Sequence, residues 1–240
     1  MHRFFADENG IVGGVAHLEK EDAQHASRVL RLQTGDEVTL FCDGEAYAAV
    51  IDSFEDGVTV RVGDKLKSPE ASVRVTLYQG VPKGDKMDYI VQKCTEGGIH
   101  RIVPVNMPRC VAKLDGKDDK KRVRWQRIAR EAAKQSFRPV TPEIASAVSM
   151  KQLPALLKQH QLVLCPWEDE HACSLREALT GEITDVAVII GPEGGMSEED
   201  VAHFSESGAK SVTLGPRIFR TETAGLASLI AIMTLTGNLE

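Results

Sequence analysis

The feature that most constrains the fold is a regular alternation of short apolar runs and helix-like segments from residue 73 onward. The runs have the length of strands, and the segments between them repeat their apolar residues with a helical period. This alternation is typical of an α/β domain built around a largely parallel sheet. The expected strands are 73–79, 99–105, 161–165, 185–190 and 211–214, and the expected helices are 85–96, 120–137, 150–160, 175–179, 197–207 and 222–235.

The first 70 residues follow a different pattern, in which apolar and polar residues alternate at 58–62 and around Val38 and Leu40, and two Asp-Gly turn pairs lie between these runs. One helix is expected over 22–32, where His25, Arg28 and Arg31 recur at a spacing of three and should share one face. We therefore predict two domains, a small β-rich domain at 1–70 and an α/β domain at 73–240.

Composition excludes several classes of protein. A chain of 240 residues with 42% hydrophobic and 27% charged residues is typical of a globular protein. Its five cysteines form no CxxC pair, which favours reduced thiols and a cytoplasmic location. The N-terminus turns acidic before an apolar stretch develops, so no signal peptide is expected. The longest apolar run, 226–233, is far shorter than the roughly 18 residues of a membrane span, so no membrane partner is expected. No metal is expected either.

The net charge of -6 is unevenly distributed. Residues 109–138 carry 11 Lys or Arg against 4 Asp or Glu, which leaves -13 on the rest of the chain. In the helix expected there, Trp125 and Ala129 belong to an apolar stripe, while Arg124 and Arg127 lie on another face. This pattern indicates either a basic surface that binds a polyanion or a well-solvated helix.

The final helix, 222–235, is apolar on nearly every face. Such a helix is stable only if it is buried on two sides. It is therefore either buried within one subunit or forms the interface of a homodimer.

Two loops at expected strand ends carry the candidate chemistry. The first, Gly191-Pro192-Glu193-Gly194-Gly195, precedes Ser197, which with Asp200 forms an expected capping box. It is either a tight turn or a ligand loop, and it matches neither GxxxxGK[ST] nor GxGxxG. The second loop runs from Leu214 to Ala224, holds two arginines and offers Thr221 as a helix cap. Together the loops suit a ligand with a purine, a ribose and a charged amino-acid tail.

These loops resemble the two signature loops of the SPOUT class of S-adenosylmethionine-dependent RNA methyltransferases. The chain is most similar to the bacterial 16S ribosomal RNA uracil-N3 methyltransferase family. An ordered series of further motifs carries the resemblance: Arg3-Phe4-Phe5, His25 with Val29-Leu30-Arg31, Gly35-Asp36-Glu37, Phe41, the segment 82–88, Gln92-Lys93, Arg109-Cys110-Val111, Lys113-Leu114-Asp115 and the segment 131–138. Gly97 and Phe219 depart from it, since the family usually carries leucine at the first position and leucine or valine at the second.

The resemblance implies a PUA-like RNA-binding β-barrel at 1–70 and a SPOUT domain with a C-terminal trefoil knot at 73–240. It implies S-adenosylmethionine as cofactor, 16S rRNA in the 30S subunit as partner, a homodimer, and methylation of uracil N3. The implied cofactor-binding residues are Leu164, Pro166, Ile190, Gly191, Glu193, Gly194, Gly195, Leu214, Gly215, Ile218, Arg220 and Thr223. The expected RNA-binding residues are Arg3, His25, Arg28, Arg31, Lys83, Lys86, Lys93, Arg109, Arg124, Arg127, Lys134 and Arg138.

Catalysis at uracil N3 requires that the base be exposed and its anion favoured. Arg220 is the first candidate to stabilise charge on the uracil oxygens, and Arg138, supplied by the same or the partner chain, is the second. Glu222 either accepts the proton, holds Arg220, or only begins a helix.

Two alternatives to this function remain. One is an RNA-binding assembly factor with a vestigial pocket, which the glycines in both loops disfavour. The other is a SPOUT enzyme that acts on a ribose 2′-hydroxyl of transfer RNA. That branch is expected to carry an Asn/Ser-rich final motif, where this chain has Arg220-Thr221-Glu222-Thr223.

Overall fold

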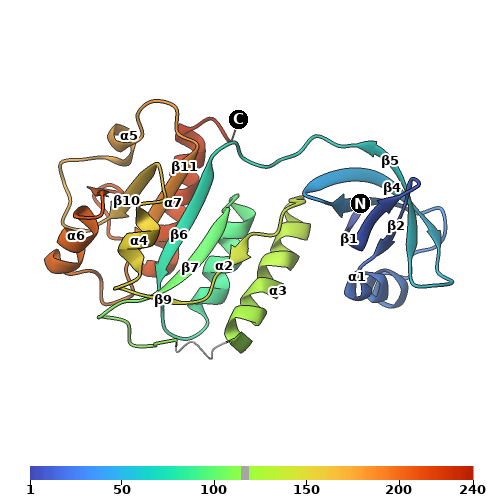
Figure 1. The fold of residues 1–240 in the computed structure, drawn as a ribbon, viewed down its shortest axis with the longest axis horizontal. Coiled ribbons are helices and arrows are strands. Elements are labelled where there is room, and N and C mark those ends of the chain that lie inside the picture. Colours follow the sequence, from blue (N-terminus) through green and yellow to red (C-terminus); the bar gives the residue numbers. More distant parts are fainter. Residues whose placement is uncertain (115–118, 240) are drawn as a thin grey trace. The chain divides into compact units, whose positions relative to one another are not determined.

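The computed structural model describes residues 1–114 and 119–239, and the chain divides into two compact units (Figure 1). The first unit combines residues 1–70 with residues 133–141, and the second contains the remainder. Segment 133–141 therefore packs with the N-terminal unit. The predicted division into 1–70 and 73–240 assigns this segment to the second domain. Asp115, which ends one of the motifs above, lies outside the described residues.

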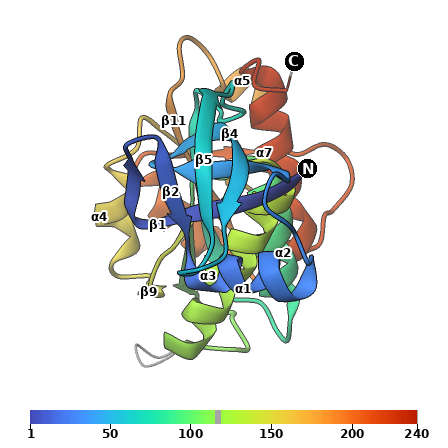
Figure 2. The same cartoon turned by 90° about the vertical axis from the view of Figure 1, so that its right-hand side faces the viewer.

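The first unit is a closed five-stranded barrel in the order β1-β2-β5-β4-β3. Its strands are β1 (His2–Val12), β2 (Val15–Leu18), β3 (Glu37–Cys42), β4 (Glu45–Ser53) and β5 (Thr59–Lys65). Neighbouring strands are antiparallel except for β1 and β3, which close the barrel in parallel. Inward-facing side chains such as Phe4, Leu40 and Ile51 are buried and form its core. Figure 2 shows these strands with α1 beside one end of the barrel.

The helix predicted over 22–32 is shorter and irregular. It consists of α1 (Lys20–Gln24) followed by the π-helix η1 (His25–Val29), and Arg31 lies beyond it with φ 54°. The prediction that Arg31 shares a helical face with His25 and Arg28 is therefore wrong, because Arg31 lies outside the helix and the other two residues lie in π-helical backbone. All three side chains are exposed.

The second unit is a parallel sheet in the order β12-β10-β11-β6-β7-β8, with β9 also paired to β7. Its strands are β6 (Arg74–Gly80), β7 (Arg101–Asn106), β8 (Glu143–Ile144), β9 (Val148–Ser149), β10 (Leu162–Pro166), β11 (Asp185–Ile190) and β12 (Ala209–Val212). Its helices are α2 (Lys86–Glu96), α3 (Asp119–Gln135), α4 (Leu153–Leu157), α5 (Leu175–Ala178), α6 (Glu198–Ser205) and α7 (Thr221–Leu235), of which the last turn of α3 belongs to the first unit. The barrel and this sheet confirm the predicted fold class. The two-residue strands β8 and β9 are too short to show an alternation in sequence.

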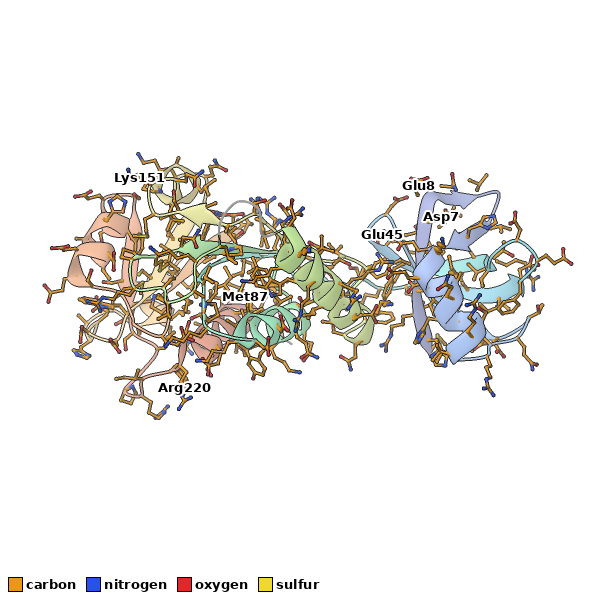
Figure 3. The ribbon with its side chains drawn as sticks, turned by 90° about the horizontal axis from the view of Figure 1, so that it is seen from below. Asp7, Glu8, Glu45, Met87, Lys151 and Arg220 are labelled. Carbon is orange, nitrogen blue, oxygen red and sulfur yellow. The ribbon has the colours of Figure 1, made fainter. Side chains whose placement is uncertain are left out.

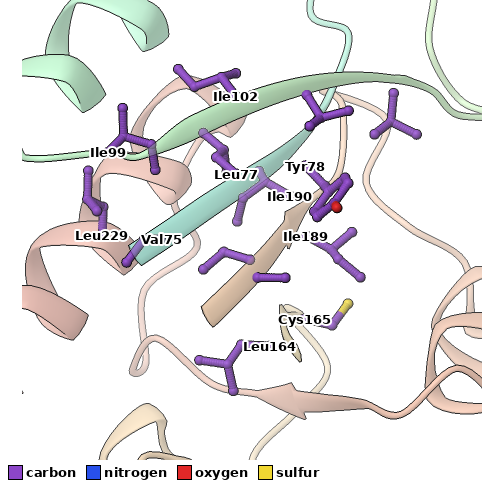
Figure 4. Close-up of a cluster of buried hydrophobic side chains, with 14 of the residues drawn as sticks. Val75, Leu77, Tyr78, Ile99, Ile102, Leu164, Cys165, Ile189, Ile190 and Leu229 are labelled. Atoms are coloured by element: carbon purple, nitrogen blue, oxygen red, sulfur yellow. The ribbon is translucent and has the colours of Figure 1, made fainter. Parts of the chain in front are cut away.

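The two faces of β6 carry different contacts (Figure 4). Val75 and Leu77 pack on the side of α7, where Leu229 is buried. Tyr78 is buried on the opposite face, and its hydroxyl lies 2.9 Å from Nε2 of His160, whose Nδ1 lies 2.5 Å from Oδ1 of Asp185. Burial is the main reason that the pKa of the Tyr78 phenol is raised, so the phenol stays protonated and can donate to His160.

Gly97 ends α2 where this helix packs against α7. A Cβ at Gly97 would lie 3.0 Å from Cδ2 of Leu229 and 3.2 Å from Cδ1 of Ile230. The two helices thus approach too closely for a leucine here without repacking. This contact explains the departure from the family pattern at Gly97.

Basic side chains hold the C-terminal end of α3 within the first unit. Lys134 pairs with Oδ1 of Asp22 at 2.8 Å, and the Asp22 side chain is only 2% exposed. The second carboxylate oxygen of Asp22 accepts the backbone N–H of Phe5 at 2.7 Å. Arg3 donates to the carbonyls of Lys134 and Gln135 at 3.0 and 2.8 Å and caps the helix end.

We expect Lys134→Met to destabilise the first unit by about 3 kcal/mol, because it leaves the buried carboxylate of Asp22 without its ammonium partner. Urea unfolding measures this loss. Lys120→Met, which removes an exposed lysine at the start of the same helix, is the matched control and should change stability by less than about 0.5 kcal/mol. Equal, small effects of both substitutions would contradict the structural role of Lys134.

Candidate active site

Because the strands of the second unit are parallel, the loops that follow them meet at one edge of the sheet. The loops after β10, β11 and β12 enclose a pocket of about 280 Å³ there, close to the lower end of the range for small-molecule sites. The pocket is lined by Pro166, Trp167, Glu168, His171, Ile190, Gly191, Pro192, Gly195, Met196, Thr213, Leu214, Gly215, Pro216, Arg217, Ile218, Phe219, Thr221 and Ala224.

The residues expected to bind the cofactor fall into two groups. Those that line the pocket are Pro166, Ile190, Gly191, Gly195, Leu214, Gly215 and Ile218. Those absent from its lining are Leu164, Glu193, Gly194, Arg220 and Thr223. Leu164 is fully buried inside β10, whereas Arg220 and Thr223 are exposed beside the start of α7. Figure 3 shows Arg220 at the edge of the unit, in the loop before this helix.

The loop after β10 contributes residues that no sequence motif singled out. Glu168 and His171 line the pocket beside Trp167, and their position directly after a strand is the only signal that the sequence offers. The indole Nε1 of Trp167 is buried without a hydrogen-bond partner among the described residues. A buried donor on a pocket wall is available to an acceptor of a bound ligand.

Close backbone contacts determine the position of the first loop. A Cβ at Gly80, the last residue of β6, would lie 2.7 Å from the backbone N of Pro192 and 2.8 Å from its Cδ. A Cβ at Gly191 would lie 2.8 Å from Cγ of Met196. Only glycine fits at these two positions, so the chain can pass directly over the end of β6.

A buried hydroxyl joins both loops to the sheet. Thr221 donates its O–H to the carbonyl of Gly191 at 2.6 Å and accepts a hydrogen bond from Nε2 of Gln79 at 2.9 Å. The prediction that Thr221 caps the last helix is wrong, because α7 begins at Thr221 and its N-cap is Arg220, which makes no side-chain capping bond. The capping box of Ser197 and Asp200 at α6 is confirmed.

The Lys86 ammonium bridges the two loops. Its Nζ lies 3.1 Å from Oε1 of Glu193 in the first loop and 3.0 Å from Oε2 of Glu222 at the start of α7. The backbone N–H of Lys83 also donates to Oε1 of Glu193 at 3.0 Å. We call Lys86, Glu193 and Glu222 the loop clasp.

Ionisation strengthens the loop clasp. Burial raises the pKa of the Glu222 carboxyl, but the backbone N–H of Glu222, Lys86 and Arg220 outweigh it, so the pKa lies below its usual value. The pKa of Glu193 is lowered in the same way, against burial, by the backbone N–H groups of Lys83 and Glu193 and by Lys86. The carboxylates of Glu222 and Glu193, which lie beside the ammonium, raise the pKa of Lys86. All three groups are therefore charged at neutral pH, and Glu222 is a weak base.

The basic residues expected to bind RNA have different surroundings. Several are engaged within their own unit: Arg3, Lys134 and Arg138 in the first, and Lys86, Lys93, Arg109 and Arg124 in the second. Arg109, for example, donates to the carbonyl of Gly194 at 3.1 Å and so supports the first loop. The side chains of His25, Arg28, Arg31, Lys83 and Arg127 are exposed.

Arg138, the second catalytic candidate, lies in the first unit and is 5% exposed. It forms a bidentate pair with Glu70, with Nε at 3.0 Å from Oε1 and an Nη at 2.7 Å from Oε2. The chain leaves α3 at Gln135, and Phe137 has φ 65°, so Arg138 is not on the basic face of the helix.

Other kinds of site are not found in the described part of the chain. Within residues 1–114 and 119–239 no three His, Cys, Asp or Glu side chains gather as a metal site, and no helix is long and apolar enough to cross a membrane. Burial raises the pKa of Cys165 to about 12, so this thiol, 4.0 Å from Sδ of Met196, stays protonated and is no nucleophile.

Comparison with known proteins gives consistent matches. Residues 69–233 match the RNA methyltransferase domain model, and residues 18–66 match the RNA methyltransferase PUA domain model. The chain is 34% identical to ribosomal RNA small subunit methyltransferase E of Bacillus subtilis, over 88% of this chain and 87% of the relative. It is 30% identical to the protein of that name from Mycobacterium bovis, over 97% and 91%. The crystal structure of ribosomal RNA small subunit methyltransferase E from Neisseria gonorrhoeae bound to S-adenosylmethionine is 31% identical, with a TM-score of 0.84 and 98% of each chain covered.

We expect Thr221→Val to lower the free energy of unfolding of the second unit by about 2 kcal/mol, because Gln79 and the Gly191 carbonyl lose a buried partner. Thr223→Val makes the same change at an exposed position two residues away and should be nearly neutral. Thermal or urea unfolding of both variants measures the difference. Indistinguishable stabilities would rule out the hydroxyl as a link between the loops.

Proposed function

The chain belongs to the RNA methyltransferase family and carries both its methyltransferase and its PUA domain, and from this we propose that it methylates uracil N3 at one uridine of 16S rRNA in the small ribosomal subunit. The observation that carries the proposal is the pocket between the loops after β10, β11 and β12. The names of the relatives support small-subunit rRNA as substrate and S-adenosylmethionine as cofactor. The enzyme would act in the cytoplasm, where the ribosome is assembled.

The pocket fits S-adenosylmethionine. Three glycines line it, Gly191, Gly195 and Gly215, the last two at φ 68° and φ 101°, so main-chain donors and acceptors can approach a ligand closely there. Trp167 adds a buried donor, and Glu168 adds a carboxylate. S-adenosylmethionine supplies a methyl group on a sulfonium when bound. The trefoil knot implied for these loops stays a prediction.

Arg220 and Glu222 are proposed to prepare the uracil. The exposed guanidinium of Arg220 precedes α7 and can stabilise negative charge on the uracil oxygens, which favours loss of the N3 proton. Since the pKa of Glu222 lies below its usual value, this carboxylate suits the role of orienting Arg220 better than that of a proton acceptor. Arg138 supports catalysis less well, because it is buried against Glu70.

RNA is proposed to contact exposed basic side chains on each unit. His25, Arg28 and Arg31 are the candidates on the first unit, and Lys83 and Arg127 are those on the second. Such contacts would reach mostly phosphates, which position the target without reading its sequence. Their share of the affinity should fall as salt rises.

We expect Gly195→Val to weaken S-adenosylmethionine binding at least about tenfold, because a branched side chain would enter the pocket at a positive φ. A Cβ at Gly195 would already lie 3.3 Å from Oε1 of Glu168. Gly208→Val is the matched control, since Gly208 also has a positive φ but has open space around it and is absent from the pocket lining. Calorimetry with S-adenosylmethionine measures both affinities.

The wild-type protein and the Gly195→Val and Gly208→Val variants also test the methylation reaction. Nucleosides from treated 30S particles that lack the modification should contain 3-methyluridine with the wild-type and Gly208→Val enzymes and little with Gly195→Val. Cofactor binding without a methylated base would favour the assembly factor with a vestigial pocket. A 2′-O-methylated nucleoside would contradict uracil N3 as the target.

A homodimer through α7 is also proposed. On the side of α7 away from the sheet, Ala227 and Ile230 are apolar and Ile230 is 37% exposed, and beside them Leu226 is partly buried against the core. An apolar strip of this kind is stabilised by burial against a second copy. We expect the wild-type chain to be a dimer by light scattering at micromolar concentration and Ile230→Glu to be a folded monomer. A wild-type monomer would refute the interface.

A further inference from the structure

Lys86 has a position that helix formation does not favour. It is the first residue of α2, where the positive end of the helix dipole disfavours a cation. Sequence patterning groups it with the RNA-binding lysines, yet its side chain is only 32% exposed and its ammonium is shared between two carboxylates. The placement is explained if the function of the ammonium is to form ion pairs within the protein.

The two carboxylates belong to the two segments that build the pocket. Glu193 lies in the loop whose neighbours Gly191 and Gly195 line the pocket, and Glu222 lies one residue beyond the pocket residue Thr221. Their side chains are 25% and 18% exposed. Without a cation between them, two partly buried carboxylates would repel each other and move the segments apart.

We propose that Lys86 is a positioning residue, which through Glu193 and Glu222 holds the first loop and the start of α7 in the geometry required for cofactor binding and for Arg220 to reach the uracil. The inference rests on the proposed function for its effect on methyl transfer. Its effect on the pocket itself does not require RNA. If Lys86 instead contacted RNA, the loss of its charge would weaken RNA binding and leave cofactor binding unchanged.

The test compares Lys86→Met with Lys83→Met, which removes an exposed lysine three residues earlier and leaves the backbone N–H to Glu193 intact. Lys86→Met should weaken S-adenosylmethionine binding about tenfold in calorimetry without RNA. It should lower kcat by up to about 100-fold with a small change in KM for 30S particles. Lys83→Met should raise KM for 30S particles and leave cofactor affinity unchanged. Lys86→Arg, which keeps a cation between the carboxylates, should restore most of both losses.

A second comparison covers the case in which Lys86→Met folds poorly, as judged by thermal unfolding. Lys86→Gln, Glu222→Gln and the double variant test the loop clasp from both sides. If the clasp acts as a unit, each single substitution weakens S-adenosylmethionine binding, and the double variant loses less affinity than the sum of the two single losses. Additive effects would overturn the proposal.

The outcomes separate this inference from the proposed function. If Lys86→Met changes only KM for 30S particles, as Lys83→Met does, Lys86 is an RNA contact and the proposal is overturned. If the wild-type enzyme methylates no rRNA but cofactor affinity falls only in Lys86→Met, the proposed substrate is wrong and the positioning role stands. If wild-type protein binds no S-adenosylmethionine, both fail.

Discussion

The arrangement of the pocket depends on the close passage of the Gly191-Pro192 peptide over the end of β6. A Cβ at Gly80 would lie 2.7 Å from the backbone N of Pro192, so the contact exists only because no side chain separates the two segments. Thr221 then joins the carbonyl of Gly191 to the buried amide of Gln79. These contacts bring the loop after β11 and the start of α7 to the same strand end, and the pocket is the space that remains between them.

Charged side chains hold in place the loop and the helix start that this backbone contact brings together. Lys86 neutralises Glu193 and Glu222, and Arg109 donates to the carbonyl of Gly194, so the first loop is held from two sides. The two ion pairs of Lys86 are only partly exposed to water, which makes them stronger than surface pairs of the same geometry, whereas the Arg109 hydrogen bond is exposed. A preorganised loop can present its backbone groups to a ligand without rearrangement, which is the basis of electrostatic stabilisation in enzymes.

The last helix contributes residues both to the site and to the proposed dimer interface. Its inner face packs against the sheet through small residues, since a Cβ at Gly225 would lie 3.1 Å from Leu77, and its N-terminus carries Thr221 and Glu222 into the site. Its outer face keeps apolar side chains such as Ile230. A dimer formed on that face would stabilise the helix whose first turn belongs to the pocket.

The sequence by itself determined the fold class, because periods of 2 and 3.6 residues report which faces of strands and helices are buried. It also determined the positions of the two ligand loops and the capping box at Ser197, since their signals are local. Only the tertiary structure decided which charges face solvent. Lys134, Arg138 and Lys86 count as basic residues in any sequence window, yet they pair with Asp22, Glu70 and Glu193, each of which lies 68 or more residues away in the chain. The roles of Thr221 and Gly80 could likewise not be predicted from the sequence, because the effect of a hydroxyl or of a missing Cβ depends on the segment that packs against it. Pairing, desolvation and close contact are properties of neighbours in space, and sequence patterns report only neighbours along the chain.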